Sequence, residues 1–320
     1  MAQALAQDSS LAYHLAVLRL SRTEISAMVA SDDDRGGDFD WDALEQEDIK
    51  VSPVFVCWYS GGISKDRGVL MMKPLTDAIK WRFPQVDTLV LHFPDTYNIE
   101  GTGKEPWPSY VDLLVSEIDK EPSRVGRPLF ILGHSRGAAP AITVSARLGS
   151  RVLKTYIVAS EAPVPGEIGP FELMAIKFKE EGDLAMMKWF LSLGPNKMLE
   201  DIVRDVESGK RTIEGDRAAT YMVNVLRKQF VDTIYPDLDR DYRGVTSPIV
   251  ALQPELDDTL TRAGQQRWKA WTSSPEGSRL KVLREATHMG CLAPHLVHER
   301  EDCPLIEEVL RDMAKVIEGS

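Results

Sequence analysis

Cysteine is scarce in this chain of 320 residues, which contains only three. They are Cys57, Cys291 and Cys303, and no two of them form a C-x-x-C pair. Three cysteines without such a pair are too few for a disulfide framework or a cysteine-rich metal site. We therefore expect a reduced, cytoplasmic protein that binds no metal.

The chain also has few positive charges and no long apolar segments, which argues against nucleic acid and membrane partners. Lysine and arginine number 38 against 49 aspartates and glutamates, a net charge of -11, which disfavours nucleic acid and anionic lipid. No stretch approaches the about 18 apolar residues of a membrane-spanning helix. Residues 1–10 lack the basic and apolar regions of a signal peptide. We predict neither a nucleic acid nor a membrane as partner.

The sequence does contain a globular composition and an alternating pattern. With 43% hydrophobic and 27% charged residues, the chain can bury a full core. From Val51 onward, short β-branched apolar runs alternate with longer amphipathic stretches, as in parallel strands joined by crossover helices. We predict an α/β fold with strands at 51–59, 88–93, 128–132, 154–159, 248–252 and 280–284, and helices at 70–82, 108–119, 136–148 and 304–318.

Two segments depart from this alternation. Residues 1–50 are predicted to be an N-terminal extension, with a helix over 9–29 and an acidic linker after it. Residues 164–243, inside an α/β domain that spans 51–320, show no strand pattern and predict a helical insertion. Its apolar residues suit a lid over a substrate, or simply a helical core, and include Met174, Phe178, Trp189 and Phe190.

The strongest chemical signal is Gly133-His134-Ser135-Arg136-Gly137, a G-x-S-x-G motif. It follows an apolar strand and precedes an alanine-rich helix, which is the setting of a nucleophile elbow. The sharp turn at such a serine brings backbones too close together for a Cβ, which explains both glycines. We therefore predict that Ser135 is a nucleophile; the alternative is an ordinary glycine-rich turn with an exposed serine.

A serine hydroxyl is a weak nucleophile unless a histidine accepts its proton, and in this architecture the histidine comes last in the chain. Three histidines follow Ser135, namely His288, His295 and His298. His288 comes just after the last predicted strand, so it is the predicted base. His295 and His298 lie farther along and indicate surface positions, or a weak H-x-x-H metal pair that lacks a convincing third ligand.

The third member of such a triad is a carboxylate that orients the histidine. Asp258 follows the strand predicted at 248–252 and is our preferred acid, with the adjacent Asp257 as an alternative. Glu161 competes because it follows an earlier strand.

An oxyanion hole needs two backbone N–H groups near the nucleophile. The residue after the serine, Arg136, supplies one, and Ser60 in the glycine-containing segment 56–62 is the candidate for the other. Trp58 and Tyr59, in the same segment, are predicted to line the substrate site.

These segments resemble type II thioesterases of nonribosomal peptide and polyketide synthesis. Val56–Gly62 is similar to their aromatic-Pro-x-Ala-Gly-Gly loop, and Arg127–Ala138 to their elbow. The spacing from Asp258 through two tryptophans to His288 also resembles theirs, as does the segment from Leu226 to Pro248 that would close their lid. The resemblance covers about residues 51–318.

The resemblance implies an α/β-hydrolase fold, with a mostly parallel sheet flanked by helices and a helical lid. It implies that Ser135 takes an acyl group from a carrier-protein thioester and releases it by hydrolysis or cyclisation. The implied partners are an acyl or peptidyl carrier protein and a small acyl substrate. No cofactor is implied, although such a substrate arrives on a phosphopantetheine arm.

The chain departs from that family at its site. Trp58 replaces a proline, Arg136 replaces a methionine or leucine, and Ala286–Met289 replaces a Gly-Gly-His-aromatic run. The Arg136 side chain could bind an anionic substrate group or pair with a lid carboxylate such as Glu180 or Glu181. Two other functions stay open: a stand-alone carboxylesterase or lipase with the same triad, and a small-ligand receptor with little turnover.

Overall fold

The computed structural model describes residues 52–59, 65–91, 107–164, 170–194, 196–230, 244–292 and 303–319. These residues belong to one compact unit, Ser52–Ser320. The extension predicted at 1–50 lies outside the described residues, as do Ser60, His295 and His298.

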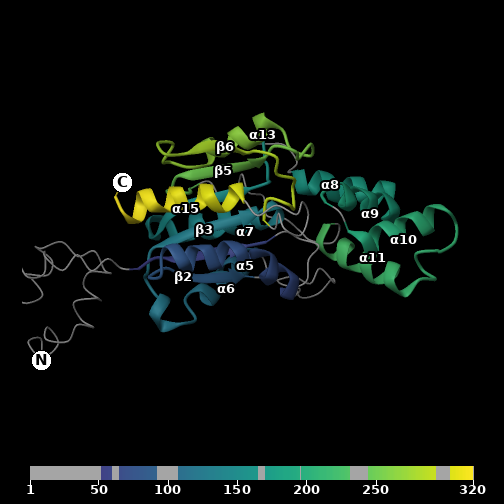
Figure 1. Cartoon of the computed structure of the whole chain (residues 1–320), viewed down its shortest axis with the longest axis horizontal. Coiled ribbons are helices and arrows are strands. Elements are labelled where there is room, and N and C mark those ends of the chain that lie inside the picture. Colours follow the sequence, from purple (N-terminus) through teal and green to yellow (C-terminus); the bar gives the residue numbers. More distant parts are fainter. Residues whose placement is uncertain are drawn as a thin grey trace, which may run out of the picture. The chain divides into compact units, whose positions relative to one another are not determined.

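The core of the described part is a sheet of six strands in the order β2-β1-β3-β4-β5-β6 (Figure 1). All five pairings are parallel. The strands are β1 (Val54–Trp58), β2 (Asp87–Leu91), β3 (Leu129–His134), β4 (Val152–Val158), β5 (Ile249–Pro254) and β6 (Arg279–Leu283). Each predicted strand is present with ends shifted by a few residues, and the predicted α/β fold is confirmed.

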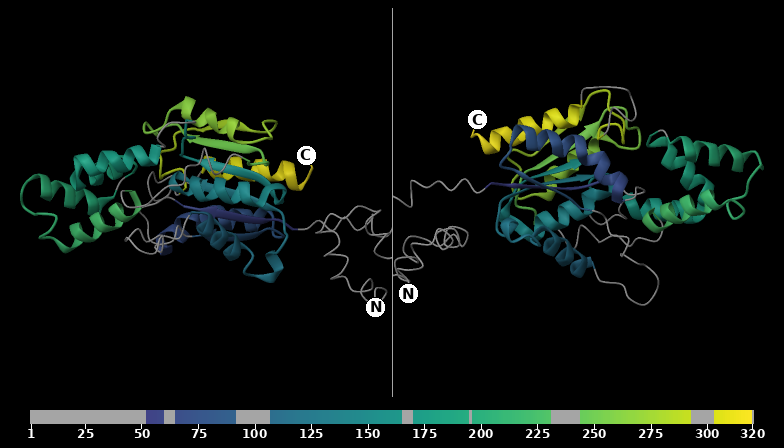
Figure 2. Two further views of the ribbon diagram at one scale, coloured as in Figure 1. Left: turned by 180° about the vertical axis from the view of Figure 1, so that it is seen from behind. Right: turned by 60° about the horizontal axis from the view of Figure 1, so that its bottom comes forward.

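Helices cover both faces of this sheet (Figures 1 and 2). One face packs on α5 (Lys65–Arg82) and α15 (Pro304–Ile317); the other packs on α6 (Trp107–Ile118), α7 (Ala138–Leu148) and the short η4 (Arg267–Trp271). The four helices predicted from the sequence are therefore present. Because both faces are covered, the central strands β1 and β3 appear in the sequence as continuous apolar runs rather than alternating ones.

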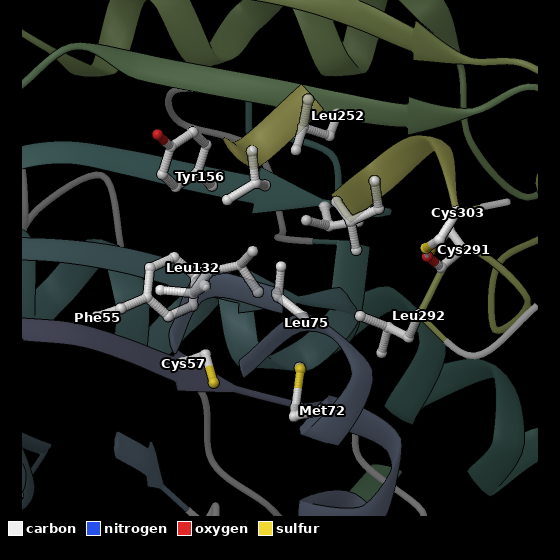
Figure 3. Packing of buried hydrophobic residues seen from close by; sticks show 14 of the residues in the cluster. Phe55, Cys57, Met72, Leu75, Leu132, Tyr156, Leu252, Cys291, Leu292 and Cys303 are labelled. Atoms are coloured by element: carbon white, nitrogen blue, oxygen red, sulfur yellow. Dashed lines mark hydrogen bonds between the residues drawn. The ribbon is translucent and has the colours of Figure 1, made fainter. Parts of the chain in front are cut away.

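Strand β1 shows how the two faces are formed. Phe55 and Cys57 join the hydrophobic cluster that includes α5 and α15, and the intervening Val54, Val56 and Trp58 join the cluster of α6 and α7. Figure 3 shows the first cluster, in which strand residues such as Phe55 and Leu132 lie with α5 residues such as Leu75.

A buried ion cluster fixes α15 to the strands. Asp312 of α15 is fully buried and lies 3.0 Å from Lys154 Nζ and 2.6 Å from Arg279 Nη2. The hydroxyl of Tyr156 in β4 donates to Asp312 over 3.0 Å. A buried carboxylate is stable only with such partners, so this cluster supports the packing of α15 on the sheet.

The interval between β4 and β5 is helical in its described residues, as the sequence predicted. It contains α8 (Pro170–Glu181), α9 (Asp183–Ser192), α10 (Lys197–Glu207) and α11 (Arg217–Phe230). Phe178 and Phe190 are buried in a hydrophobic cluster of these helices, and Met174 and Trp189 pack against it. The rings of Phe178 and Trp189 lie 5.4 Å apart. These four residues thus form a helical core; their function as a lid stays a prediction.

Candidate active site

The residues that follow β3, β5 and β6 all emerge at one edge of the sheet, because the three strands are parallel. Ser135 follows β3, Asp257 follows the end of β5, and His288 follows β6. The carboxyl edge of a parallel sheet is where such folds bind ligands.

Ser135 has the backbone conformation of a nucleophile elbow. Its φ is 52°, a left-handed value that a residue with a side chain rarely adopts. Ser135–Gly137 form a single tight turn between β3 and α7. A Cβ on Gly133 would overlap the carbonyl group of Gly137, and one on Gly137 would lie 2.6 Å from the carbonyl oxygen of Trp58. Backbone atoms cannot move aside, so the motif needs both glycines for the reason the sequence indicated.

His288 is paired with a carboxylate through one ring nitrogen. Its Nδ1 lies 2.6 Å from Oδ2 of Asp257, and both side chains are buried. Burial alone would raise the pKa of Asp257, but hydrogen bonds from His288 and Thr259 outweigh it and hold this pKa below its ordinary value. A charged Asp257 accepts the Nδ1 proton, which leaves Nε2 as the basic nitrogen. Within the described part of the chain, Nε2 is buried and has no hydrogen-bond partner.

The preference for Asp258 as the partner of His288 was therefore wrong, and the adjacent Asp257 takes that place. Asp258 is exposed, whereas Asp257 is buried. The backbone N–H of Asp257 donates to Pro254 at the end of β5, over 3.4 Å, so the chain turns at this point. In this turn the Asp257 side chain faces His288 and the Asp258 side chain is exposed.

The alternative acid, Glu161, has other partners. Its carboxylate accepts a hydrogen bond from the backbone N–H of Thr261 and lies 3.6 Å from Arg267 Nη2. A Cβ on Gly264 would overlap this carboxylate. Glu161 thus supports the segment around α13 (Arg262–Gln266), and the contact with His288 is made by Asp257.

A second histidine, which was not predicted from the sequence as a site residue, also contacts His288. His134, the residue before Ser135, is fully buried and places its Nε2 2.8 Å from the carbonyl oxygen of His288. A carbonyl only accepts, so Nε2 is the protonated nitrogen of His134. Burial, followed by the influence of His288, lowers the pKa of His134 to about 3. Its only signal in the sequence is its position beside the nucleophile.

The side chains predicted around the oxyanion hole lie in the protein interior. Trp58 belongs to the cluster of α6 and α7, and Tyr59 packs on α5 against Gly68. The Arg136 side chain is only 2% exposed, and burial lowers its pKa well below the ordinary value. A contribution of Trp58 and Tyr59 to substrate binding, and of the Arg136 N–H to an oxyanion hole, stays a prediction.

The lid carboxylates suggested as partners of Arg136 do not share its environment. Glu180 and Glu181 are exposed, and Glu181 lies 4.0 Å from Lys177. The Arg136 guanidinium, in contrast, is buried.

The helical insertion contacts the site through the residue after His288. Met289 packs against the insertion's cluster and also against the cluster of α5 and α15. A Cβ on Gly194, just after α9, would lie 3.2 Å from Met289 Cβ. The insertion is therefore placed against the segment that carries the histidine.

Among the described residues, no group of three or more His, Cys, Asp or Glu side chains is placed to hold a metal ion. No described helix is both long enough and apolar enough to cross a membrane.

Comparison with solved structures gives distant matches of similar length. The RedJ thioesterase of prodiginine biosynthesis from Streptomyces coelicolor is 15% identical, with 82% of this chain and 91% of that chain covered and a TM-score of 0.49. ClbQ of the colibactin pathway is 15% identical, with 83% and 98% covered and a TM-score of 0.49. An enol-lactonase from Burkholderia xenovorans is 18% identical, with 82% and 92% covered and a TM-score of 0.48. Identities and TM-scores at this level support no conclusion about substrate.

Comparison with curated protein sequences gives no match. The alpha/beta hydrolase family, in contrast, matches residues 78–300, which is more than half of the 320 residues. The matched range includes the elbow, Asp257 and His288. The chain belongs to the alpha/beta hydrolase family.

Proposed function

We propose that this protein is a serine hydrolase that releases an acyl group from a thioester, with Ser135, His288 and Asp257 as its triad. The observation that carries the proposal is the 2.6 Å contact between His288 Nδ1 and Asp257 Oδ2; the same histidine contacts His134, which precedes a serine whose φ is 52°. That contact fixes the tautomer in which Nε2 accepts a proton, and the strained turn presents the serine hydroxyl.

In the proposed reaction, the Ser135 hydroxyl attacks the acyl carbonyl as its proton passes to Nε2 of His288. The negative charge of Asp257 stabilises the imidazolium that forms. His288 then returns the proton to the leaving thiol, and the acyl group remains on Ser135 as an ester. Water, or a hydroxyl or amine within the acyl chain, attacks this ester and releases an acid or a cyclic product.

The tetrahedral intermediate carries an oxyanion that needs backbone donors. The N–H of Arg136 follows the nucleophile at the start of the turn into α7, where the helix N-terminus also favours negative charge. Ser60 is the proposed second donor and lies outside the described residues. This reaction requires no cofactor, since the triad supplies both the nucleophile and the proton transfer.

The preference for a thioester substrate is supported by the sequence resemblance to type II thioesterases. We propose an acyl or peptidyl carrier protein as the partner that delivers the acyl group on a phosphopantetheine arm. The helical insertion, which packs against Met289, would cover the acyl chain and limit the entry of water.

A matched pair of substrates tests this preference. One acyl chain is presented as a carrier-protein thioester and as an ethyl ester, and kcat/KM is measured for both. We expect the thioester to be favoured by about tenfold or more, a difference of about 1.4 kcal/mol in transition-state stabilisation. A preference for the ethyl ester would instead identify a carboxylesterase or lipase. Tight binding of acyl ligands without turnover would identify a receptor.

Replacing Arg136 with methionine tests whether this buried guanidinium recognises the substrate. The variant keeps the backbone N–H, so oxyanion stabilisation should survive. We expect kcat/KM for the carrier-protein thioester to fall by about ten- to a hundredfold, as for one lost charge-assisted contact of about 1.5 to 3 kcal/mol. A neutral short-chain ester, measured as the control, should change little. An equal loss on both substrates would show that Arg136 supports the interior of the protein instead.

A further inference from the structure

We infer that His134 is a positioning residue that holds the backbone of His288 in place through a hydrogen bond from its Nε2–H to the His288 carbonyl. This inference rests on the proposed function, since it assigns His134 a part in keeping the base aligned with the nucleophile.

The contact is well defined. The Nε2 to oxygen distance is 2.8 Å, and His134 is 0% exposed. The two imidazole rings meet edge to face with centroids 5.3 Å apart. Because burial and the neighbouring His288 lower the pKa of His134 to about 3, the ring stays neutral at the near-neutral pH at which the enzyme would be assayed. His134 therefore acts as a fixed donor and does not compete with His288 for protons.

The Nδ1 atom of His134 supports a specific purpose for the hydrogen bond that its Nε2 donates to His288. Within the described residues, this Nδ1 is buried without a hydrogen-bond partner. A buried polar atom left without a partner disfavours the folded state. An apolar side chain would avoid that penalty, so stability alone does not account for a histidine here.

The contact also links the segment of the base to that of the nucleophile. His134 is the last residue of β3, and Ser135 follows it directly. Asp257 fixes the His288 ring, and His134 fixes its main chain. The Cys291 thiol lies 3.2 Å from the same carbonyl oxygen and adds a weak second donor. A misplacement of about 1 Å in a catalytic group can reduce the rate by about a hundredfold, so a fixed main chain matters for catalysis.

Two substitutions at His134 separate positioning from stability. His134→Leu removes the donor, and His134→Gln keeps an amide N–H at about the place of Nε2. We expect His134→Leu to lower kcat by about 10- to 100-fold with KM within about twofold, because the substrate still binds but meets a displaced base. His134→Gln should recover kcat to within about threefold of the wild-type value.

Tyr156→Phe is the matched control. It removes another buried hydrogen bond, the one to Asp312, and does not touch the site. We expect a lower melting temperature with kcat unchanged. If Tyr156→Phe lowers kcat as much as His134→Leu does, or if His134→Gln is as slow as His134→Leu, the inference fails. Wild-type kcat in His134→Leu would also overturn it.

If His134→Leu does not fold, His134→Asn replaces it, because the asparagine nitrogen lies near the place of Nδ1 and cannot reach the carbonyl. His134→Asn should then be slow and His134→Gln fast, and equal rates would overturn the inference. Fluorophosphonate labelling of Ser135 in the wild type keeps the two hypotheses apart. Absence of labelling contradicts the proposed function, whereas labelling that is equally fast in the His134 variants contradicts only the inference.

Discussion

Replacement of Ser135 with alanine is expected to abolish turnover and covalent labelling by a fluorophosphonate while the protein stays folded. The hydroxyl is the atom that becomes acylated, and loss of a nucleophilic serine lowers kcat by about 10⁶-fold in enzymes of this mechanism. Alanine relieves none of the backbone strain at φ 52° and adds no bulk, so the melting temperature should change little.

A second buried serine provides the control for this experiment. Ser145 in α7 donates a hydrogen bond to the carbonyl of Ala141 over 2.7 Å and lies outside the proposed triad. Ser145→Ala should keep full labelling even if its stability falls. Hydrolysis at the wild-type rate in Ser135→Ala would remove the nucleophile assignment.

Replacement of Asp257 with asparagine should have the next largest effect. We expect kcat to fall by about 10³ to 10⁴, the loss found when a catalytic histidine loses its orienting carboxylate. The asparagine amide can donate to Nδ1 of His288, which would leave the proton on Nε2 and prevent that nitrogen from accepting one from Ser135. Steady-state kinetics with the preferred thioester, at a pH where the wild type is fully active, give the comparison.

The adjacent residue makes this test specific. Asp258→Asn changes the same functional group one position along the chain, at an exposed site, and should leave kcat within a few-fold of the wild-type value. Glu161→Gln should likewise keep an active triad, because its amide oxygen can still accept from the Thr261 N–H and only the charge pairing with Arg267 is lost. A large loss in Asp258→Asn, with Asp257→Asn active, would contradict the assignment drawn from the structure.

The choice between these two aspartates shows where sequence reasoning reached its limit. The central strands β1 and β3 were predictable because residues buried on both faces form apolar runs. The elbow was predictable because its tight turn leaves no room for a Cβ on either glycine. Which of two adjacent carboxylates faces His288 depends on the backbone torsions of the turn after β5. The dipeptide Asp257-Asp258 carries no signal for them.

His134 and Trp58 show two other limits. His134 occupies a variable position of the G-x-S-x-G motif, and its partner is a backbone carbonyl 154 residues farther along the chain. No local sequence pattern predicts a contact between residues so far apart in the chain. Trp58 lies in a segment that indicated a substrate loop, and in the structure it is the last residue of β1 and packs in the hydrophobic cluster of α6 and α7. The sequence of a strand end does not show how deeply an aromatic side chain there is buried.

Intact-mass spectrometry with a panel of acyl thioesters tests the central claim most directly. We predict that at least one thioester adds the mass of its acyl group to the wild-type protein, that peptide mapping places this group on Ser135, and that Ser135→Ala acquires none. An acyl group found on another residue, or product formed from a thioester with no acyl adduct under rapid-quench conditions, would contradict it.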